Sequence, residues 1–367
     1  MAKKKEQAET QTLSIKTTVL QDMVNRAIKG AGQNKLIPIT SLMAIQLKNK
    51  QLTLITTDAS NTLYVMHTLE VDDFYCVVQA EQFSKLISKM TSENTMLELV
   101  NSTLTVKGNG NYKLELPLDE NGKAIKYPDP VADSQLDGDS VEINLTTIKS
   151  ILNVNKAALA TTLEEPVYTG YYVGDKVVTT DSYKICGLDV KLFDEPVLIS
   201  PEMMELLGIM TSEKINVYMQ DDILEFVTDD CIVYGHKMPD IEEFAIDAIS
   251  GLLDEEFESS CKVVKSDLLA LLDRIGLFVS VYDDRMIILT FTDCGIEISS
   301  KQSNGVETIA YTESKNVKEY TCCIDLLMLT QQIKANTADT IEIQFGNERS
   351  IKLVNGDVTQ LIALISA

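Results

Sequence analysis

The sequence has very little of what most enzyme and metal sites require. Of its 367 residues only two are histidines, His67 and His236, and neither has a serine, cysteine or metal-ligand partner at a recognised spacing. Neither a phosphate-binding P-loop nor a dinucleotide-binding fingerprint occurs. The acidic group Asp133, Asp137 and Asp139 does not follow the ligand pattern of a calcium-binding EF-hand loop. We therefore expect no catalytic residue, no cofactor and no metal site.

Long hydrophobic runs and paired cysteine motifs are also missing. No apolar stretch approaches the roughly 18 residues of a membrane span. The basic start, Met1–Gln11, has no apolar segment behind it, which predicts a disordered basic tail over residues 1–11 and no signal peptide. The seven cysteines show no C-x-x-C spacing, as is typical of a reducing compartment. The sequence thus predicts a cytoplasmic protein.

Basic charge is scarce, with 32 Lys and Arg against 55 Asp and Glu and a net charge of −23. Taken over the whole chain, this argues against nucleic-acid binding, because neutralising phosphates needs Lys and Arg. The argument fails if the basic residues gather on one face. Three predicted helices carry more base than acid, namely Thr17–Lys29, Ala80–Met90 and Thr146–Leu159, whereas Pro201–Met210 is acidic. A basic face therefore stays open as an interpretation.

One sequence pattern occurs three times along the chain. A β-branched strand ends in Thr-Asp, a polar break follows, and a second apolar strand resumes. The three copies are Leu52–Val65, Val177–Leu188 and Ile287–Ile298. Because they lie about a third of the chain apart, they indicate repeated domains and not a solenoid of short repeats.

Each repeat has the order strand, helix, strands, helix, strands. The helices carry a narrow apolar stripe, which favours packing of one face on a sheet. The sequence predicts an α+β fold of three repeated domains, each with two helices on antiparallel sheet, with domains at residues 12–132, 133–250 and 251–367. The last predicted helices are Ser266–Phe278 and Ile324–Lys334, and Asp119–Asp139 reads as a linker.

At this point the repeats resemble the bacterial replicative sliding clamp, the β subunit of the replicative DNA polymerase. The resemblance covers nearly the whole chain after residue 11. The stretch Val177–Ile185 is similar to the family's A-T-D-G-H-R-L signature, and Lys237–Phe244 to the F-P-D stretch that closes its second domain. The other matching segments are Leu36–Ile39, Thr57-Asp58, Tyr127–Asp129 and Val197–Leu207.

The resemblance implies a processivity factor without enzymatic activity, in which two chains join head to tail into a ring around duplex DNA. Helices line the hole of such a ring and sheets form its outside, so a modestly basic bore can coexist with an acidic exterior. DNA contacts of this kind carry no sequence information. The residues implied to contact phosphates are Arg26, Lys29, Lys35, Lys85, Lys89, Lys149, Lys156, Arg274 and Lys334.

The resemblance also implies a pocket for short peptides of the polymerase and the clamp loader. Here Gly-His-Arg-Leu of the family is Ser-Tyr-Lys-Ile, and its terminal M-P-M-R-L is Ala-Leu-Ile-Ser-Ala. Such divergence would suit a phage-encoded clamp. The implied pocket residues are Tyr168, Thr180, Ser182, Tyr183, Lys184, Ile185, Pro239, Phe244, Leu361, Ala363, Leu364 and Ile365. The alternative interpretation is that the apolar members are ordinary strand residues packed in the core.

Contact between two chains is implied for Leu114 and Leu116 on one side and for Phe278 and Val279 on the other. An exposed sheet edge at each end of a chain would be covered by such a head-to-tail contact. A different class of function stays open beside the clamp: an acidic, non-enzymatic scaffold or DNA-mimicking protein of the same fold that does not encircle DNA. The acidic residues Glu202 and Glu205 favour this alternative.

Overall fold

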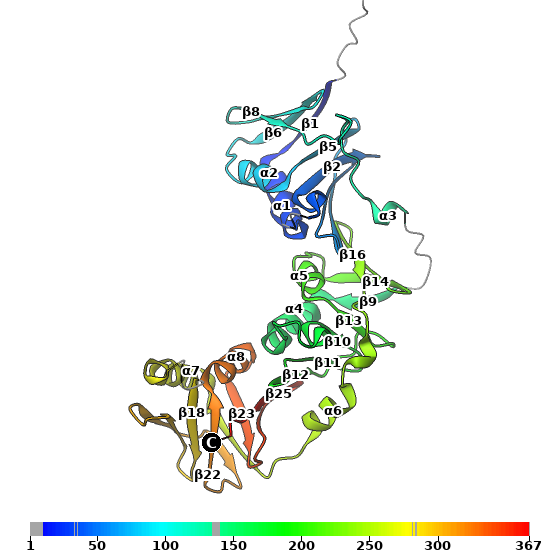
Figure 1. Ribbon diagram of the computed structural model, residues 1–367. Helices are drawn as coiled ribbons and strands as arrows, with labels where there is room; N and C mark the ends of the chain where they lie inside the picture. Colours follow the sequence, from blue (N-terminus) through cyan, green and yellow to red (C-terminus); the bar gives the residue numbers. More distant parts are fainter. Residues whose placement is uncertain are drawn as a thin grey trace, which may run out of the picture. The chain divides into compact units, whose positions relative to one another are not determined.

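The fold is built from antiparallel strand pairs, and some of these pairs join strands of different predicted domains. The computed structural model describes residues 10–32, 34, 36–133, 140–280, 282 and 285–366. The chain divides into two compact units, one of Met1–Leu145 with Glu202–Lys237 and one of Thr146–Pro201 with Met238–Ala367 (Figure 1). Segments from the predicted middle domain, residues 133–250, therefore belong to both units.

The first unit holds a four-stranded sheet of order β1-β6-β7-β8 and an eight-stranded sheet of order β5-β2-β3-β4-β16-β15-β14-β9. Its strands are β1 (Thr10–Lys16), β2 (Leu42–Lys48), β3 (Gln51–Thr57), β4 (Asn61–Thr68), β5 (Phe74–Gln79), β6 (Asn94–Val100), β7 (Thr103–Lys107), β8 (Asn111–Glu115), β9 (Val141–Asn144), β14 (Lys214–Gln220), β15 (Ile223–Val227) and β16 (Cys231–His236). Its helices are α1 (Thr17–Ala27), α2 (Ala80–Ile87), α3 (Pro130–Asp133) and, apart from its first residue, α5 (Pro201–Gly208), with short 3-10 helices η1 (Ile28–Gly30) and η2 (Pro38–Ser41).

The second unit repeats this plan with a nine-stranded sheet of order β13-β10-β11-β12-β25-β24-β23-β17-β21 and a four-stranded sheet of order β20-β19-β18-β22. Its strands are β10 (Tyr171–Val173), β11 (Val177–Thr180), β12 (Lys184–Leu188), β13 (Val197–Ile199), β17 (Ser259–Val264), β18 (Met286–Phe291), β19 (Ile296–Ser300), β20 (Val306–Ile309), β21 (Glu313–Lys315), β22 (Tyr320–Asp325), β23 (Thr340–Phe345), β24 (Ser350–Asn355) and β25 (Val358–Ala363). Its helices are α4 (Leu145–Asn155), apart from its first residue, α6 (Ile246–Asp254), α7 (Lys265–Ile275) and α8 (Leu326–Ala335), with 3-10 helices η3 (Lys156–Ala158), η4 (Pro166–Thr169), η5 (Ile241–Glu243) and η6 (Gly276–Phe278).

Two strand pairs join segments that lie far apart in the chain. In the first unit β4 pairs with β16, with Val65 opposite Cys231 and Asn61 opposite Gly235. In the second unit β12 pairs with β25 over five residue pairs, from Lys184 opposite Ile362 onward. Each pairing makes one continuous sheet out of strands from two successive repeats.

The repeated Thr-Asp pair closes the same tight turn in each repeat. The threonine hydroxyl donates to a carbonyl oxygen across the turn, from Thr57 to Asn61 at 2.7 Å, from Thr180 to Lys184 at 2.8 Å and from Thr292 to Gly295 at 3.1 Å. In the first two copies the aspartate Oδ1 also accepts two backbone N–H groups of the turn. The motif that organises the sequence is therefore a turn-forming device.

Each helix buries one stripe against its sheets, as the narrow apolar pattern predicts. On α1 the buried residues include Leu20, Met23 and Val24, and burying each such side chain stabilises the fold by about 1.5–3 kcal/mol. In the second unit the rings of Phe291 and Phe345 stack with centroids 3.8 Å apart inside the core shared by α7 and α8. Figure 1 shows α1 beside α2 and α7 beside α8.

The predicted α+β fold is confirmed, but several element boundaries differ. Each helix that opens a repeat ends early and continues as one 3-10 turn, because the last turn of a helix often tightens. Strand β1 begins at Thr10, inside the predicted tail, where it pairs with Val100; residues 1–9 lie outside the described part. The predicted linker contains α3, and its Tyr127 is packed among apolar side chains. Helix α6 was not predicted, although Ile246, Ile249 and Leu253 have helical spacing.

Among the described residues, no helix is both long and apolar enough to span a bilayer.

A partly buried ion pair connects α1 to the turn between β15 and β16. Arg26 Nη1 lies 2.7 Å from Asp230 Oδ2, and the Arg26 side chain is only 11% exposed. Asp230 also accepts from the hydroxyls of Thr211 at 2.8 Å and Thr228 at 3.0 Å. Burial alone would raise the pKa of Asp230, but the hydrogen bonds from Thr211 and Arg26 outweigh it and lower the pKa.

We expect Asp230→Asn to reduce the free energy of unfolding of the first unit by about 1.5–3 kcal/mol at neutral pH, because it removes charge-assisted hydrogen bonds from a buried guanidinium. Since the folded pKa lies below the unfolded value of about 4, the contribution is complete above that value and disappears as pH falls through the folded pKa. Urea unfolding of both proteins across this pH range measures the difference, which should shrink in acid.

The exposed Asp222, which pairs with His236, provides a control as Asp222→Asn and should give a much smaller change. A difference between Asp230→Asn and the parent protein that is the same at all pH values would contradict this role of the ion pair.

Candidate functional site

The predicted phosphate contacts of the first unit are not equally available. Arg26 is committed to Asp230, so contact with a phosphate would require this ion pair to break. Lys85 Nζ lies 2.5 Å from Glu81 Oε1 on α2, whereas Lys89 is exposed. Lys29 is exposed and lines a cavity of about 430 Å³ together with the acidic side of α5, Glu202 and Glu205. Lys35 lies outside the described residues.

In the second unit the structure brings two of the predicted lysines together. Lys156 on η3 and Lys334 on α8 line one cavity of about 500 Å³, and Lys184 and Gln331 line it too. Lys149 is exposed on α4. Arg274 is engaged differently, because its guanidinium makes a two-pronged contact with the carboxylate of Glu307, with Nε–Oε1 at 2.9 Å and Nη2–Oε2 at 2.7 Å.

Three apolar residues of the predicted peptide pocket are packed under the chain's own side chains. Ile185, Phe244 and Leu361 are 8%, 2% and 4% exposed and belong to one apolar cluster with residues of α6. The Phe244 ring stacks on Tyr172 with centroids 5.0 Å apart and meets Tyr168 edge-on at 5.2 Å. The packing favours the alternative interpretation for these three residues, that they are core residues.

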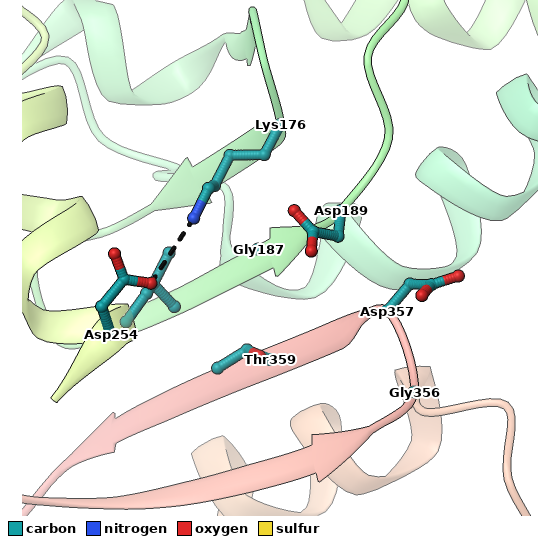
Figure 2. Close-up of a pocket in the computed structure, with 8 residues that line it drawn as sticks. Lys176, Gly187, Asp189, Asp254, Gly356, Asp357 and Thr359 are labelled. Atoms are coloured by element: carbon teal, nitrogen blue, oxygen red, sulfur yellow. Dashed lines mark ion pairs between the residues drawn. The ribbon is translucent and has the colours of Figure 1, made fainter. Parts of the chain in front are cut away.

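Helix α6 is fixed over this cluster by two lysines and one glycine, of which Figure 2 shows Lys176 and Gly187. Lys176 Nζ lies 3.6 Å from Asp254 Oδ1. The Lys352 ammonium donates to the Leu253 carbonyl at 2.8 Å; burial lowers the pKa of this lysine. A Cβ atom on Gly187 would meet Leu253 Cδ1 at 3.0 Å, so a larger residue there would require the Leu253 side chain to shift.

Figure 2 shows the small cavity beside α6, with Lys176 and Asp254 on one side and Asp189 and Asp357 on the other. Its volume is about 90 Å³, enough for about three water molecules at roughly 30 Å³ each. Within the described part of the chain no group of three or more His, Cys, Asp or Glu side chains could hold a metal ion.

A larger cavity of about 370 Å³ opens at the Thr-Asp turn of the second repeat, and we call it the turn cavity. Three predicted peptide-site residues line it: Tyr168, Ser182 and Tyr183. Tyr183 is 63% exposed. Its other lining residues are Ala160, Thr161, Thr162, Glu164, Glu165 and Asp181. The loop 160–165 was not predicted as part of the site, because it carries no local motif. It lies against the turn only in the folded chain.

Lys184 positions the turn that carries Tyr183 and does not line the turn cavity. Its ammonium donates to the Ala157 carbonyl at 2.8 Å and to Gln331 Oε1 at 3.1 Å, and it lies 3.2 Å from Asp181 Oδ2. Thr180, 2% exposed, closes the same turn.

The C-terminal strand supports this turn from the other side. Ala363 N–H donates to the Tyr183 carbonyl at 2.8 Å, and the next two residues, Leu364 and Ile365, donate to Arg349 and Cys323. Of the predicted terminal residues, Ala363 therefore holds the turn through a backbone hydrogen bond, whereas Leu364 and Ile365 bind residues outside the turn. Pro239 is exposed, outside the lining of the turn cavity.

The residues implied in chain–chain contact differ in exposure. Leu114 and Leu116 are buried in the first unit at 8% and 9% exposure. In the second unit Phe278 is 54% exposed and its neighbour Leu277 is 82% exposed, while Val279 is half-buried.

Comparison with known proteins supports the resemblance. The family described as DNA polymerase III beta subunit, N-terminal domain, matches residues 11–122. No curated protein sequence matches the chain. Among solved structures, the DNA polymerase sliding clamp of Bacillus subtilis is similar at a TM-score of 0.83 and 17% identity, covering 98% of this chain and 100% of that one. The polymerase beta subunit of Streptococcus pyogenes gives 0.83 and 18%, over 97% and 100%.

The DNA polymerase III beta chain of Streptococcus pneumoniae is similar at a TM-score of 0.84 and 16% identity, covering 97% of this chain and 100% of that one. TM-scores of 0.83–0.84 establish the fold over 97–98% of the chain, and the family match adds a sequence similarity over residues 11–122. The chain thus has the fold of the bacterial sliding clamps, and its residues 11–122 match the family described as DNA polymerase III beta subunit, N-terminal domain.

Proposed function

We propose that this protein is a DNA sliding clamp, a non-catalytic ring that encircles duplex DNA and tethers the replicative DNA polymerase for processive synthesis. The observation that carries the proposal is the similarity of the whole chain to clamp structures. The protein would act in the cytoplasm as a homodimer. Its partners would be duplex DNA of any sequence and short peptides of the polymerase and the clamp loader, and no membrane is involved.

The exposed lysines supply the DNA contacts in this proposal. Lysine on a long flexible stem attracts phosphates without reading bases, which suits a protein that slides. We assign the contacts mainly to Lys29, Lys89, Lys149 and Lys334, which are exposed, and Lys156 stays a candidate beside them. Arg26, Lys85 and Arg274 are engaged by carboxylates of the same chain and would contribute less, and Lys35 stays a candidate.

Ring closure would join an edge strand of each unit. Strand β8 is one edge of the first unit's four-stranded sheet, and β20 is one edge of the second unit's. Near them lie exposed apolar side chains that are costly to leave in water: Tyr112 on β8, Val306 on β20, and Leu277 and Phe278 on η6. The buried Leu114 and Leu116 would support the edge from below. In this proposal the three clamp domains are residues 12–132, 133–250 and 251–367.

A second candidate function is an acidic scaffold or DNA mimic of the same fold that does not encircle DNA. The carboxylates Glu202 and Glu205 beside Lys29 and the pairing of Arg274 with Glu307 favour it. Retention on circular DNA distinguishes the two functions, because a ring that encircles the duplex stays on a circular molecule and a scaffold that does not encircle DNA is not retained in this way.

A ring requires dimerisation, and the exposed residues of η6 provide a test. We expect sedimentation at micromolar concentration to give a dimer for the parent protein, and Leu277→Asp with Phe278→Asp to give a monomer, because two carboxylates would be buried in the interface. As a control, Leu327→Asp changes a comparably exposed apolar residue on α8 and should stay dimeric. A parent protein that stays monomeric at all concentrations contradicts ring closure.

The DNA contacts are tested by Lys149→Glu with Lys156→Glu. Clamps loaded on circular duplex should stay bound and should leave linear duplex by its ends, and the double variant should be retained less. Each lost phosphate contact should reduce the salt slope of binding by about 0.9. Changing two other lysines of the second unit, the half-buried Lys262 and the exposed Lys318, which pair with Glu313 and Glu258, serves as the control. Equal retention on linear and circular DNA would rule out the ring.

A further inference from the structure

The wall of the turn cavity is acidic and rich in hydroxyl groups. Of its nine lining residues three are carboxylates, Glu164, Glu165 and Asp181, and none is Lys or Arg. Thr161, Thr162, Ser182, Tyr168 and Tyr183 supply the hydroxyls. A cavity with this wall is complementary to a cation that also carries hydrogen-bond donors.

The three carboxylates differ in how far they are already neutralised. Asp181 accepts the backbone N–H groups of Tyr183 and Lys184 at 3.0 and 2.7 Å and lies 3.2 Å from the Lys184 ammonium. Glu164 and Glu165 are exposed and have no ion pair with any residue that the structure describes. The negative charge available to a ligand is therefore that of Glu164 and Glu165.

The negative charge of Glu165 acts on Tyr168, which is a residue of the cavity wall. The pKa of Tyr168 is raised, mainly by burial and next by the negative charge of Glu165. The Tyr168 ring meets Phe244 edge-on at 5.2 Å, and Phe244 follows the exposed residues Glu242 and Glu243 directly in the chain.

Exposed apolar side chains stand beside this charge. Leu163, between the lining residues Thr162 and Glu164, is 80% exposed, and Tyr183 is 63% exposed. A leucine and an aromatic ring left this open near a cavity are typical of a surface that receives an apolar anchor of a partner. The volume of about 370 Å³ fits one or two side chains of a peptide and not a folded domain.

We propose that the turn cavity selects short extended peptides in which a Lys or Arg lies next to an aromatic or aliphatic anchor. The anchor packs on Leu163 and Tyr183, and the cationic group lies against Glu164 and Glu165. The inference rests on the proposed function, since it names the class of peptide that such a clamp takes from its polymerase or loader. A peptide with acidic residues beside the same anchor is rejected by like-charge repulsion.

The test uses two labelled peptides that share one Leu-Phe anchor, flanked by lysines in one and by glutamates in the other. Binding to the full chain is measured by fluorescence anisotropy at low and high salt. Each exposed charge pair changes affinity by a factor of about 1.5 to 5, so two pairs should favour the lysine peptide by about 2- to 25-fold. The preference should fall with salt, because these charges are exposed.

Two variants and a control locate the effect. Glu164→Lys with Glu165→Lys should reverse the preference between the peptides, and Tyr183→Ala should weaken binding of both. Glu297→Gln with Asp339→Asn removes two exposed carboxylates of the same unit that do not line the turn cavity, and should leave the preference unchanged.

Equal binding of the two peptides by the parent protein overturns the charge inference and leaves the clamp function standing. Unchanged binding in Tyr183→Ala overturns it by placing the peptide elsewhere. If neither peptide binds, the turn cavity is not a peptide site at all, and retention on circular DNA then decides separately whether the protein is a clamp.

Discussion

The fold depends on two strand pairings, β4 with β16 and β12 with β25, that fuse successive repeats into single sheets. Backbone ladders of this kind are specific in register, because a slip of one residue would turn every buried side chain toward solvent. In the second unit the β12–β25 seam is also fixed by buried polar groups. Gln360 Nε2 donates to Gln332 Oε1 at 2.7 Å, and Cys186 Sγ lies 2.9 Å from the same oxygen. Since unpaired polar groups in a core are costly, this network stabilises one register over others.

The same turn serves structure in every repeat and, under the proposed function, peptide binding in one of them. Thr57, Thr180 and Thr292 close equivalent turns with the same hydroxyl hydrogen bond. The second turn differs because it presents Tyr183 to solvent and is held by the ammonium of Lys184. A site that depends on such a turn is already well ordered before a partner binds, which reduces the entropy that binding has to overcome.

The repeated architecture could be predicted from the sequence because its signals are local. Strand alternation, narrow apolar stripes and the Thr-Asp break lie within a few residues of each other, and they gave the α+β fold and the main helices. The role of Phe244 could not be predicted in this way. Its burial depends on α6 and on Tyr172, which come from separate segments of the chain. Arg26 likewise has the charge and length of a DNA-contacting side chain. Only its position beside Asp230 in the folded chain shows that it already forms an ion pair.

The availability of charge also explains how a chain of net charge −23 can hold DNA under the proposed function. A protein that binds an open surface of DNA must gain its affinity from many phosphate contacts, and loses it as salt rises. A closed ring is retained because leaving requires the ring to open, so weak contacts are sufficient. Few exposed lysines then serve sliding better than many, since each tight contact would slow movement along the duplex. Carboxylates that engage Arg26 and Arg274 fit this requirement, because they leave flexible lysines as the main positive charges.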